Sequence, residues 1–304
     1  DFESLNFENG TVPQIGNSDR IDWALKSVLG RINYNFNDRY LITLTARRDG
    51  STKFGTNNKW ATFPSAAIGW RLVNEQFFES SGLTNIFDDF KLRVSYGLTG
   101  NSQIPAYRST SDLSPRYYVF NNQLVSGYAA TRMPNADLKW EQTRMFNAGL
   151  DMSFLNNRLG LTVDYFSNRT TDLLLEVSIP QSTGFNTLLK NTGSLTNKGF
   201  EFSADFKAIR TDNFTWDING NISVLRNEIE DLGDSAPFYA TSTSGHLGVD
   251  GSWVEAGNPI GVWRGYKYIG IKEDGSPNYE DKNADGKFTA EDYSIIGDPN
   301  PNFT

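Results

Sequence analysis

The 304-residue chain contains no cysteine and a single histidine, His246. Without thiols it has no disulfides, no thiolate metal sites and no thiol nucleophile. His246 lies in the Ser/Gly-rich stretch TSTSGHLG with no second histidine to share a metal ion, so we interpret it as a loop residue. No motif among the acidic residues points to a glycosidase carboxylate pair. We therefore expect no catalytic site and no enzyme activity.

Positive charge and long apolar runs are also scarce. The net charge is −8, and nucleic-acid binders instead carry a basic patch, so we expect no nucleic-acid partner. No uncharged apolar run approaches the roughly 18 residues of a spanning helix, and LLLEVSI (173–179) is interrupted by Glu176. The first residues show no basic-then-apolar signal segment. Because the chain starts in what reads as a loop and stops where a strand begins, we interpret it as an internal piece of a larger protein.

What the sequence has in abundance is alternation of apolar and polar residues. In NFTWDINGNISVLRN (213–227), Phe, Trp, Ile and Val at even positions oppose Thr, Asp, Asn and Ser at odd positions. Successive side chains of a strand point to opposite faces, so one face is apolar and the other is wet. Similar alternation predicts about eight strands of about ten residues, long enough to cross a membrane at a tilt. They are expected near 28–36, 40–47, 67–72, 91–99, 146–154, 159–168, 200–207 and 214–224.

The connections between these strands alternate in length. Short turns are expected at 37–39, 156–158 and 210–213, with a longer one at 79–89, and long links at about 50–60, 101–137, 172–193 and 228–300. Short turns on one side and long loops on the other are typical of an outer-membrane barrel. A soluble sandwich also alternates, but its loops need not sort this way. The sequence therefore predicts an all-β fold, an antiparallel meander of about eight to ten long strands forming a partial transmembrane β-barrel.

The two strand faces differ in a way that favours the barrel. Aromatic residues gather beside the short turns while smaller apolar residues fill the strand middles, as in the girdle at a lipid–water boundary. The alternative is that aromatics are simply good strand formers. The polar face carries charged residues and Asn on nearly every strand, which fits a barrel lumen. Arg48 shares the apolar face but lies at the loop end, where a long side chain can snorkel.

Longer phrases add a family resemblance that covers nearly the whole chain. They are RRDGSTKFG (47–55), FPSAAIGWRL (63–72), LRVSYGLTGN (92–101), NADLKWEQT (135–143), NNRLGLTVDYFSNRTTDLLL (156–175), NTGSLTNKGFEF (191–202), GNPIGVWRGYKYIGI (257–271) and DKNADGKFTAEDYSIIGDPNPNF (281–303). In this order the phrases resemble the SusC/RagA family of TonB-linked outer-membrane transporters of Bacteroidetes-type bacteria.

The resemblance implies a multi-pass barrel of about 22 strands with an N-terminal plug. It further implies closure by a SusD-like lipoprotein, energy from the TonB–ExbB–ExbD complex, contact with outer-membrane lipid, and uptake of oligosaccharides or peptides. Residues 1–304 would then be part of the barrel, with long external loops at about 101–137, 172–193 and 228–300, and with the plug and TonB box lying elsewhere. Two alternatives stay open: a TonB-dependent siderophore or vitamin receptor, and a soluble extracellular glycan-binding β-sandwich.

One loop carries a metal-ligand pattern, DKNADGKFTAED at 281–292. It places oxygen donors at the spacing of a calcium loop, with a turn glycine at Gly286. The predicted ligands are Asp281, Asn283, Asp285, the carbonyl of Lys287, and Asp292. Asp292 replaces the usual bidentate Glu, so we expect a lower affinity for Ca²⁺, and no amphipathic helix precedes the loop as in an EF-hand. The alternative is an Asx-rich turn in a solvated loop.

Two aromatic groups lie in the long links. Trp263, Tyr266 and Tyr268 suggest either a sugar-stacking platform or a short strand pinned by its rings, and we favour the strand. Tyr117, Tyr118 and Phe120 have three candidate contacts: a substrate, a SusD-like lid, or each other. The sequence does not assign any of these rings to substrate binding.

Overall fold

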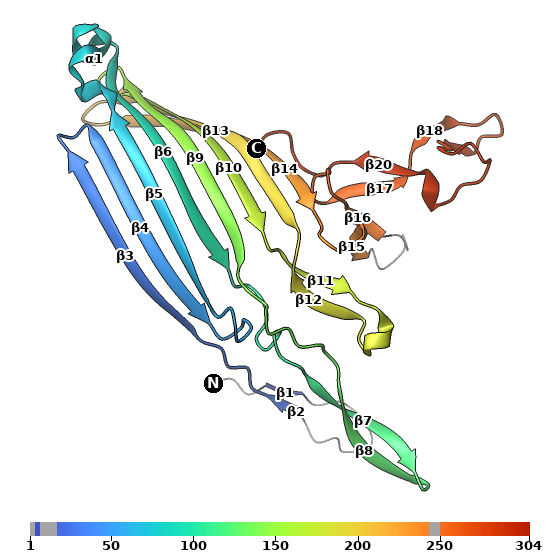
Figure 1. Cartoon of the computed structure of the whole chain (residues 1–304). Coiled ribbons are helices and arrows are strands. Elements are labelled where there is room, and N and C mark those ends of the chain that lie inside the picture. The colour runs from blue at the N-terminus through green and yellow to red at the C-terminus, as the bar shows by residue number, and fades with distance from the viewer. Residues whose placement is uncertain (1–3, 7–16, 243–249) are drawn as a thin grey trace.

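A computed structural model describes residues 4–6, 17–242 and 250–304, so His246 lies outside the described residues. Its main feature is one curved antiparallel sheet of eight strands in the order β14-β13-β10-β9-β6-β5-β4-β3 (Figure 1). The strands are β3 (Leu25–Phe36), β4 (Tyr40–Ser51), β5 (Trp60–Arg71), β6 (Phe87–Asn101), β9 (Glu141–Phe154), β10 (Leu159–Thr171), β13 (Ser194–Arg210) and β14 (Thr215–Asp231). The predicted all-β meander is confirmed.

The strands are longer than expected, at 12 to 17 residues. Their ends run past the alternating stretches into polar sequence, which gives no periodic signal. β5 shows the largest difference, because it begins at Trp60 and the expected strand begins at residue 67. Pro64 obscured this half of the strand. It is tolerated because residues before Ser65 pair only with β4, and β6 joins from Ser65 onward.

The short turns all lie at the end of the sheet that carries α1 (Figure 1). In the turn between β3 and β4, Asn37 and Asp38 have φ values of 53° and 51°, which suits the mirror-image turns that match strand twist. The longer turn between β5 and β6 holds three short helical segments: η1 (Leu72–Asn74), α1 (Gln76–Ser80) and η2 (Leu83–Asn85). Short connections therefore share one end, as the sequence predicts.

At the opposite end, the long links fold into hairpins and small sheets. The elements are β7 (Leu113–Phe120), β8 (Gln123–Ala130), β11 (Leu174–Ser178), η3 (Gln181–Thr183), β12 (Thr187–Asn191), β15 (Phe238–Ser242), β16 (Asp250–Val254), β17 (Val262–Tyr266), β18 (Tyr268–Ile271), β19 (Pro277–Tyr279), η4 (Ala290–Asp292) and β20 (Tyr293–Gly297), together with β1 (Ser4–Asn6) and β2 (Asn17–Asp19). Thr304, the last residue, exchanges two backbone hydrogen bonds with Ser223 of β14.

The main buried cluster lies at the base of these loops and not between two sheets. Its members are Phe54, Phe63, Ile104, Leu138, Trp140 and Leu189. The indole of Trp140 packs against Phe54, with 4.7 Å between ring centroids, and donates a hydrogen bond to the Lys59 carbonyl. Gly55 approaches residue 136 so closely that a Cβ there would lie 2.0 Å from the Ala136 carbonyl oxygen. This cluster fixes the loops to the sheet.

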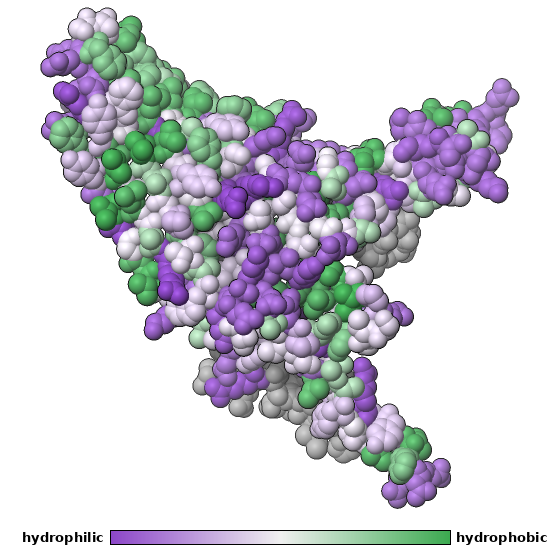
Figure 2. Space-filling model, viewed as in Figure 1, coloured by the Kyte–Doolittle hydropathy of each residue, from purple (hydrophilic) through white to green (hydrophobic). Residues whose placement is uncertain are grey.

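Strand register gathers the apolar side chains of the large sheet on one face, called here the outer face. One row across all eight strands contains Tyr34, Ile42, Ile68, Val94, Ala148, Tyr165, Phe200 and Val224. Ile68 and Phe200 remain 56% and 57% exposed. In Figure 2, hydrophobic residues gather at the β3 margin and along the edge by α1, and hydrophilic residues cover the centre of the view and the β18 hairpin. No second sheet covers the outer face within the described residues, so the β-sandwich alternative is wrong.

Aromatic rings join neighbouring strands near the short turns. Tyr34, Phe36, Tyr40 and Trp70 form a chain with 6.3 to 6.4 Å between successive ring centroids. A second group contains Phe78, Phe87, Phe90 and Phe154, with centroids 4.9 to 6.0 Å apart. Both groups of rings lie at the short-turn end of the sheet, in the position expected of one girdle.

Neighbouring residues of β10 test which face meets lipid. Leu161 pairs with Met152 and Ala204 on the outer face, and Thr162 pairs with Asp151 and Ser203 on the polar face. Near the bilayer midplane an outward-facing arginine costs about 2–4 kcal/mol. Val163, opposite Leu150 and Phe202 on the outer face, lies nearer the middle of the strand than Leu161. We therefore expect Val163→Arg to destabilise the full-length barrel by about this amount and Thr162→Arg to cost much less, as measured by equilibrium unfolding in lipid. Equal costs at the two positions would contradict the face assignment.

Candidate functional site

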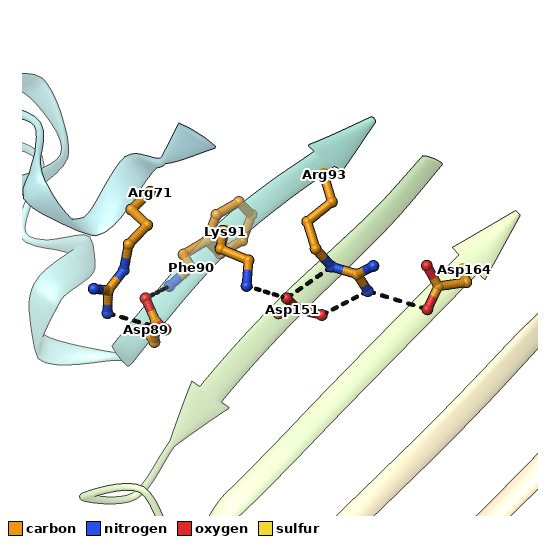
Figure 3. A network of polar contacts seen from close by, with 7 residues as sticks. All are labelled: Arg71, Asp89, Phe90, Lys91, Arg93, Asp151 and Asp164. Atoms are coloured by element: carbon orange, nitrogen blue, oxygen red, sulfur yellow. Dashed lines mark hydrogen bonds and ion pairs between the residues drawn. The ribbon is translucent and has the colours of Figure 1, made fainter. Parts of the chain in front are cut away.

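The polar face of the large sheet carries a network of charged side chains from neighbouring strands (Figure 3). Arg71 lies 3.3 Å from Asp89, and the Lys91 Nζ lies 2.8 Å from Asp151. The Arg93 guanidinium donates two hydrogen bonds of 2.8 Å to Asp151. The same Arg93 guanidinium donates a third hydrogen bond, of 3.1 Å, to Asp164 of β10 on the far side of β9. The network therefore ties β6, β9 and β10 together on this face.

A glycine makes this reach across β9 possible. Gly149 lies in register between Arg93 and Asp164, so it occupies the strand that the guanidinium must cross. A Cβ at Gly149 would lie 2.2 Å from Asp164 Oδ1 and 2.7 Å from Arg93 Nη2. Both contacts are too short for any side chain larger than hydrogen. Gly149 is therefore a spatial requirement of the network.

The network is partly withdrawn from water. Arg93 and Asp151 keep 34% and 27% of their side-chain surface exposed, and Asp164 keeps 15%. Asp164 Oδ1 is buried without a hydrogen-bond partner among the described residues. Glu201 of β13 pairs directly opposite Asp164, which places two acids side by side. Bidentate arginine pairing compensates part of the cost of burying these charges.

Beside this network the polar face is hollowed rather than enclosed. A cavity of about 410 Å³ is lined on the β10, β13 and β14 side by Asp164, Glu201, Ser203, Asn221 and Ser223. These carboxylates, hydroxyls and the amide offer both hydrogen-bond donors and acceptors, and none of the hydroxyls is paired with a base. Chemically, the surface can contact and guide a polar solute, but it contains no recognisable machinery for a reaction.

The predicted calcium loop folds as a tight turn around three of its expected ligands. Asp281 accepts hydrogen bonds from the backbone amides of Asp285 and Gly286, and Asn283 also accepts from Asp285. Gly286 has a φ of 77°, a conformation that favours glycine. Among the described residues, no three or more His, Cys, Asp or Glu side chains converge in a way that could hold a metal ion.

Asp292 has a different role in this geometry. Its carboxylate is fully buried and accepts hydrogen bonds from the backbone amides of Thr289 and Lys282, at 2.8 and 3.0 Å. Together with Thr289 it forms a capping box around η4. Backbone donation from Thr289 lowers the pKa of Asp292 below its usual value. Because that pKa is lowered on folding, the stability Asp292 contributes is present at neutral pH and is lost as the pH falls through its folded value.

The two aromatic groups differ in their packing. Tyr266 packs its ring against Tyr279, Phe288 and Tyr293, with 4.7 Å to the last, so it pins β17 as the sequence favoured. Trp263 and Tyr268 are 55% and 56% exposed. A second set of rings, on β7, also stays largely exposed: Tyr117, Tyr118 and Phe120. No pair of these three rings stacks within the part of the chain that the structure describes.

The fold defines the wall of an outer-membrane-type barrel, and comparisons with known proteins assign the family. The family model for "TonB dependent receptor-like, beta-barrel" matches residues 2–301. TonB-dependent receptor P3 of Formosa agariphila is 36% identical over 98% of this chain and 31% of its own length. TonB-dependent receptor SusC of Bacteroides thetaiotaomicron is 42% identical over 71% of this chain and 22% of its own length.

Solved structures agree with the sequence comparison. The structure of the RagAB peptide transporter aligns with a TM-score of 0.81 and 27% identity, covering 95% of this chain and 31% of that one. The 'open-open' state of the RagAB peptide importer aligns with a TM-score of 0.80 and 26% identity, covering 97% of this chain and 32% of that one.

The chain belongs to the TonB-dependent receptor β-barrel family, and the resemblance to its SusC/RagA members is confirmed. It spans 22% to 32% of the length of the relatives and structures named above. Membership places it in the outer membrane, among receptors and not among enzymes. Every helix in the described part of the chain is too short or too polar to cross a bilayer.

Sequence reasoning identified the polar face but missed how its charges pair. The alternation marks Arg93, Asp151 and Asp164 as members of one face, but it gives no register between β6, β9 and β10. The alternation identifies Gly149 only as a small residue on the polar face of its strand. Strand register alone reveals that it lies between two opposite charges.

Gly149 offers a test of the network. We expect Gly149→Ala in the full-length protein to displace Arg93 from Asp164 and to destabilise the barrel by about 1–3 kcal/mol. Gly160→Ala is the matched control, because a Cβ at Gly160 would have its nearest contact at an ordinary 3.8 Å. The measurement is equilibrium unfolding of both variants in lipid. A shift no larger for Gly149→Ala than for the control would contradict the spatial requirement.

Proposed function

We propose that this chain forms part of the barrel wall and external loops of a TonB-dependent transporter for solutes too large for porins. The carrying observation is the single sheet with an exposed apolar outer face and a charged polar face. In a barrel, that arrangement turns the outer face to lipid and the polar face to the lumen. Hairpins at one end and short turns at the other then correspond to the outside and the periplasm.

The proposed substrates are oligosaccharides or peptides. RagAB is a peptide transporter, which supports the peptide class, and SusC is 42% identical to this chain. A lumen wall that mixes carboxylates, guanidinium groups, amides and hydroxyls hydrogen-bonds to either class. The siderophore or vitamin alternative has less support, since SusC and RagAB are among the proteins this chain resembles.

The proposed partners are a SusD-like lipoprotein outside and the TonB–ExbB–ExbD complex inside. The hairpin β7–β8 is the best-placed contact for the lipoprotein among the described loops. Tyr117, Phe120, Leu124 and Tyr128 are 67% to 75% exposed on it, and Arg116 is its single charged residue. A surface this apolar on an external loop is a typical mark of a protein contact.

Deletion of the full-length gene in its host tests the proposed transport. We expect the deletion strain to lose growth on oligosaccharides or on oligopeptides while growing normally on the corresponding monomers. Removing TonB should give the same loss, because the barrel has no energy source of its own. Growth on both oligomer classes without the gene, or loss of ferric-siderophore uptake alone, would contradict the proposal.

We also propose that the 273–298 loop orders around Ca²⁺ at Asp281, Asn283, Asp285, the Lys287 carbonyl and Asp292. The support is the oxygen spacing and the turn that already gathers the first three side chains. Asp292 is the weakest of the proposed ligands, since both of its carboxylate oxygens already accept hydrogen bonds from backbone amides. The expected affinity is therefore weak, about 10⁻⁴ to 10⁻³ M, as in extracellular calcium modules.

Calorimetry on the full-length protein tests this loop. We expect millimolar Ca²⁺ to bind, and Asp281→Asn to weaken binding at least tenfold, since it removes a charged ligand. Asp274→Asn, on a neighbouring part of the loop outside the ligand pattern, is the matched control. Absence of binding at millimolar Ca²⁺, or equal effects of the two substitutions, would leave the Asx-rich turn as the explanation.

A further inference from the structure

The outer face of the large sheet is not apolar along its whole length. Toward the long loops, four basic residues appear on it in two adjacent rows, called here the outer basic patch. They are Arg144 of β9, Arg169 of β10, Lys198 of β13 and Arg226 of β14. All four alternate in step with outward-facing apolar residues such as Phe146, Tyr165, Phe200 and Val224, so they share the outer face.

The register sets like charges directly beside each other in this patch. Arg144 pairs with Arg169, and Lys198 pairs with Arg226. Like charges directly opposite on one face are destabilising unless an anion lies between them. Arg169 has such a partner, with its Nε 2.6 Å from Glu230.

Arg144, Lys198 and Arg226 make no ion pair within the described part of the chain. All three are exposed. The carboxylates on this part of the outer face are Glu228 and Glu230, and Glu230 is already held by Arg169, Ser194 and Thr196. The patch therefore retains net positive charge. By contrast Arg48, also on the outer face, lies over the ring of Trp60 at 5.4 Å.

The height of the patch coincides with the expected boundary of the membrane. Arg169 lies ten residues along β10 from Leu159, at the short-turn end. At about 3.4 Å per residue this is about 34 Å along the strand. A strand tilt of about 40° reduces it to about 26 Å, close to the apolar band of about 25 Å in outer-membrane barrels. The patch thus falls where lipid headgroups of the outer leaflet begin.

A concave surface also exists at this position. A cavity of about 520 Å³ lies along the edge strand β14. Its lining includes Lys198, Arg226 and Glu228 from the outer face, Leu225 and Asn227 of β14, and Asp298, Asn300 and Pro301 of the following loop. Additional strands of a closed barrel pair with the edges of the sheet and do not cover its outer face. Completing the barrel therefore leaves the cations facing the surrounding lipid.

We propose that the outer basic patch binds the phosphate groups of an anionic lipid in the outer leaflet. Arginine and lysine at a membrane boundary recognise phosphate by charge-assisted hydrogen bonds, and arginine can do so with two bonds at once. The exposed rings of Phe146, in the same row as Lys198, and of Phe200, one row below the patch, would contact the acyl chains of the same molecule. This inference rests on the proposed orientation of the sheet in the membrane.

The test uses the full-length protein purified in a neutral detergent and titrated with diphosphorylated lipid A under native mass spectrometry. The variant Arg144→Gln/Lys198→Gln/Arg226→Gln is expected to bind it at least tenfold more weakly than wild type. Arg31→Gln/Arg116→Gln/Lys207→Gln is the matched control, since it removes the same charge from the polar face and the β7–β8 hairpin. Its affinity is expected to stay within about twofold of wild type.

Parallel arms separate the sources of phosphate. Wild type is expected to bind phosphatidylethanolamine, which has no net charge, at least tenfold more weakly, and inorganic phosphate is expected not to displace lipid A at equal concentration. Equal affinity of variant and control, or displacement by inorganic phosphate, would overturn the lipid site. A change in oligomeric state of the patch variant with unchanged lipid binding would instead assign the patch to a second copy.

The outcomes also distinguish this inference from the proposed function. Wild type that does not fractionate with outer membranes would overturn both. Wild type that supports growth on the oligomeric substrate, but binds lipid A no better than the patch variant does, would overturn the lipid site alone. A patch variant that loses lipid binding and still supports transport confirms a lipid site separate from the conduit.

Discussion

The structure depends on backbone register, because the hydrogen-bonded ladder decides which side chains share a face. From β3 to β14 the pairing keeps the apolar positions aligned, so that Tyr34, Val94 and Val224 belong to one continuous row. A slip by one residue in any pair would turn an apolar row toward the lumen and a charged row toward lipid. Both faces therefore enforce the same register, one by hydrophobicity and the other by ion pairing.

The polar face shows how such a sheet is braced without a core between layers. Arg93 reaches over Gly149 to Asp164, so three strands are joined by one guanidinium. The aromatic chain from Tyr34 to Trp70 connects three further strands near the short turns. These cross-strand contacts supplement the backbone ladder where neither face packs against another part of the described chain.

The sequence predicts the eight strands and the short turns well, because lipid and lumen impose a strict two-residue period on every crossing strand. It predicts β5 poorly, since Pro64 and small residues hide the period. It also misses the outer basic patch. Arg144 and Arg226 lie beyond the predicted alternating stretches, and the sequence of one strand does not show which residues of the next strand lie beside it. The long links were expected as loops, and their hairpins are local pairings whose register a coarse pattern does not give. The predicted calcium loop lies outside what the comparisons test and stays a proposal.

The cluster around Phe54 and Trp140 has a consequence for how such a protein can diversify. It holds the roots of several loops with their own buried side chains, independently of what the tips contain. Hairpins such as β7–β8 project beyond it and share no buried contact with the sheet's faces (Figure 1). Their tips can therefore accept substitutions and insertions while the anchoring residues remain, so new recognition surfaces can evolve on an unchanged foundation.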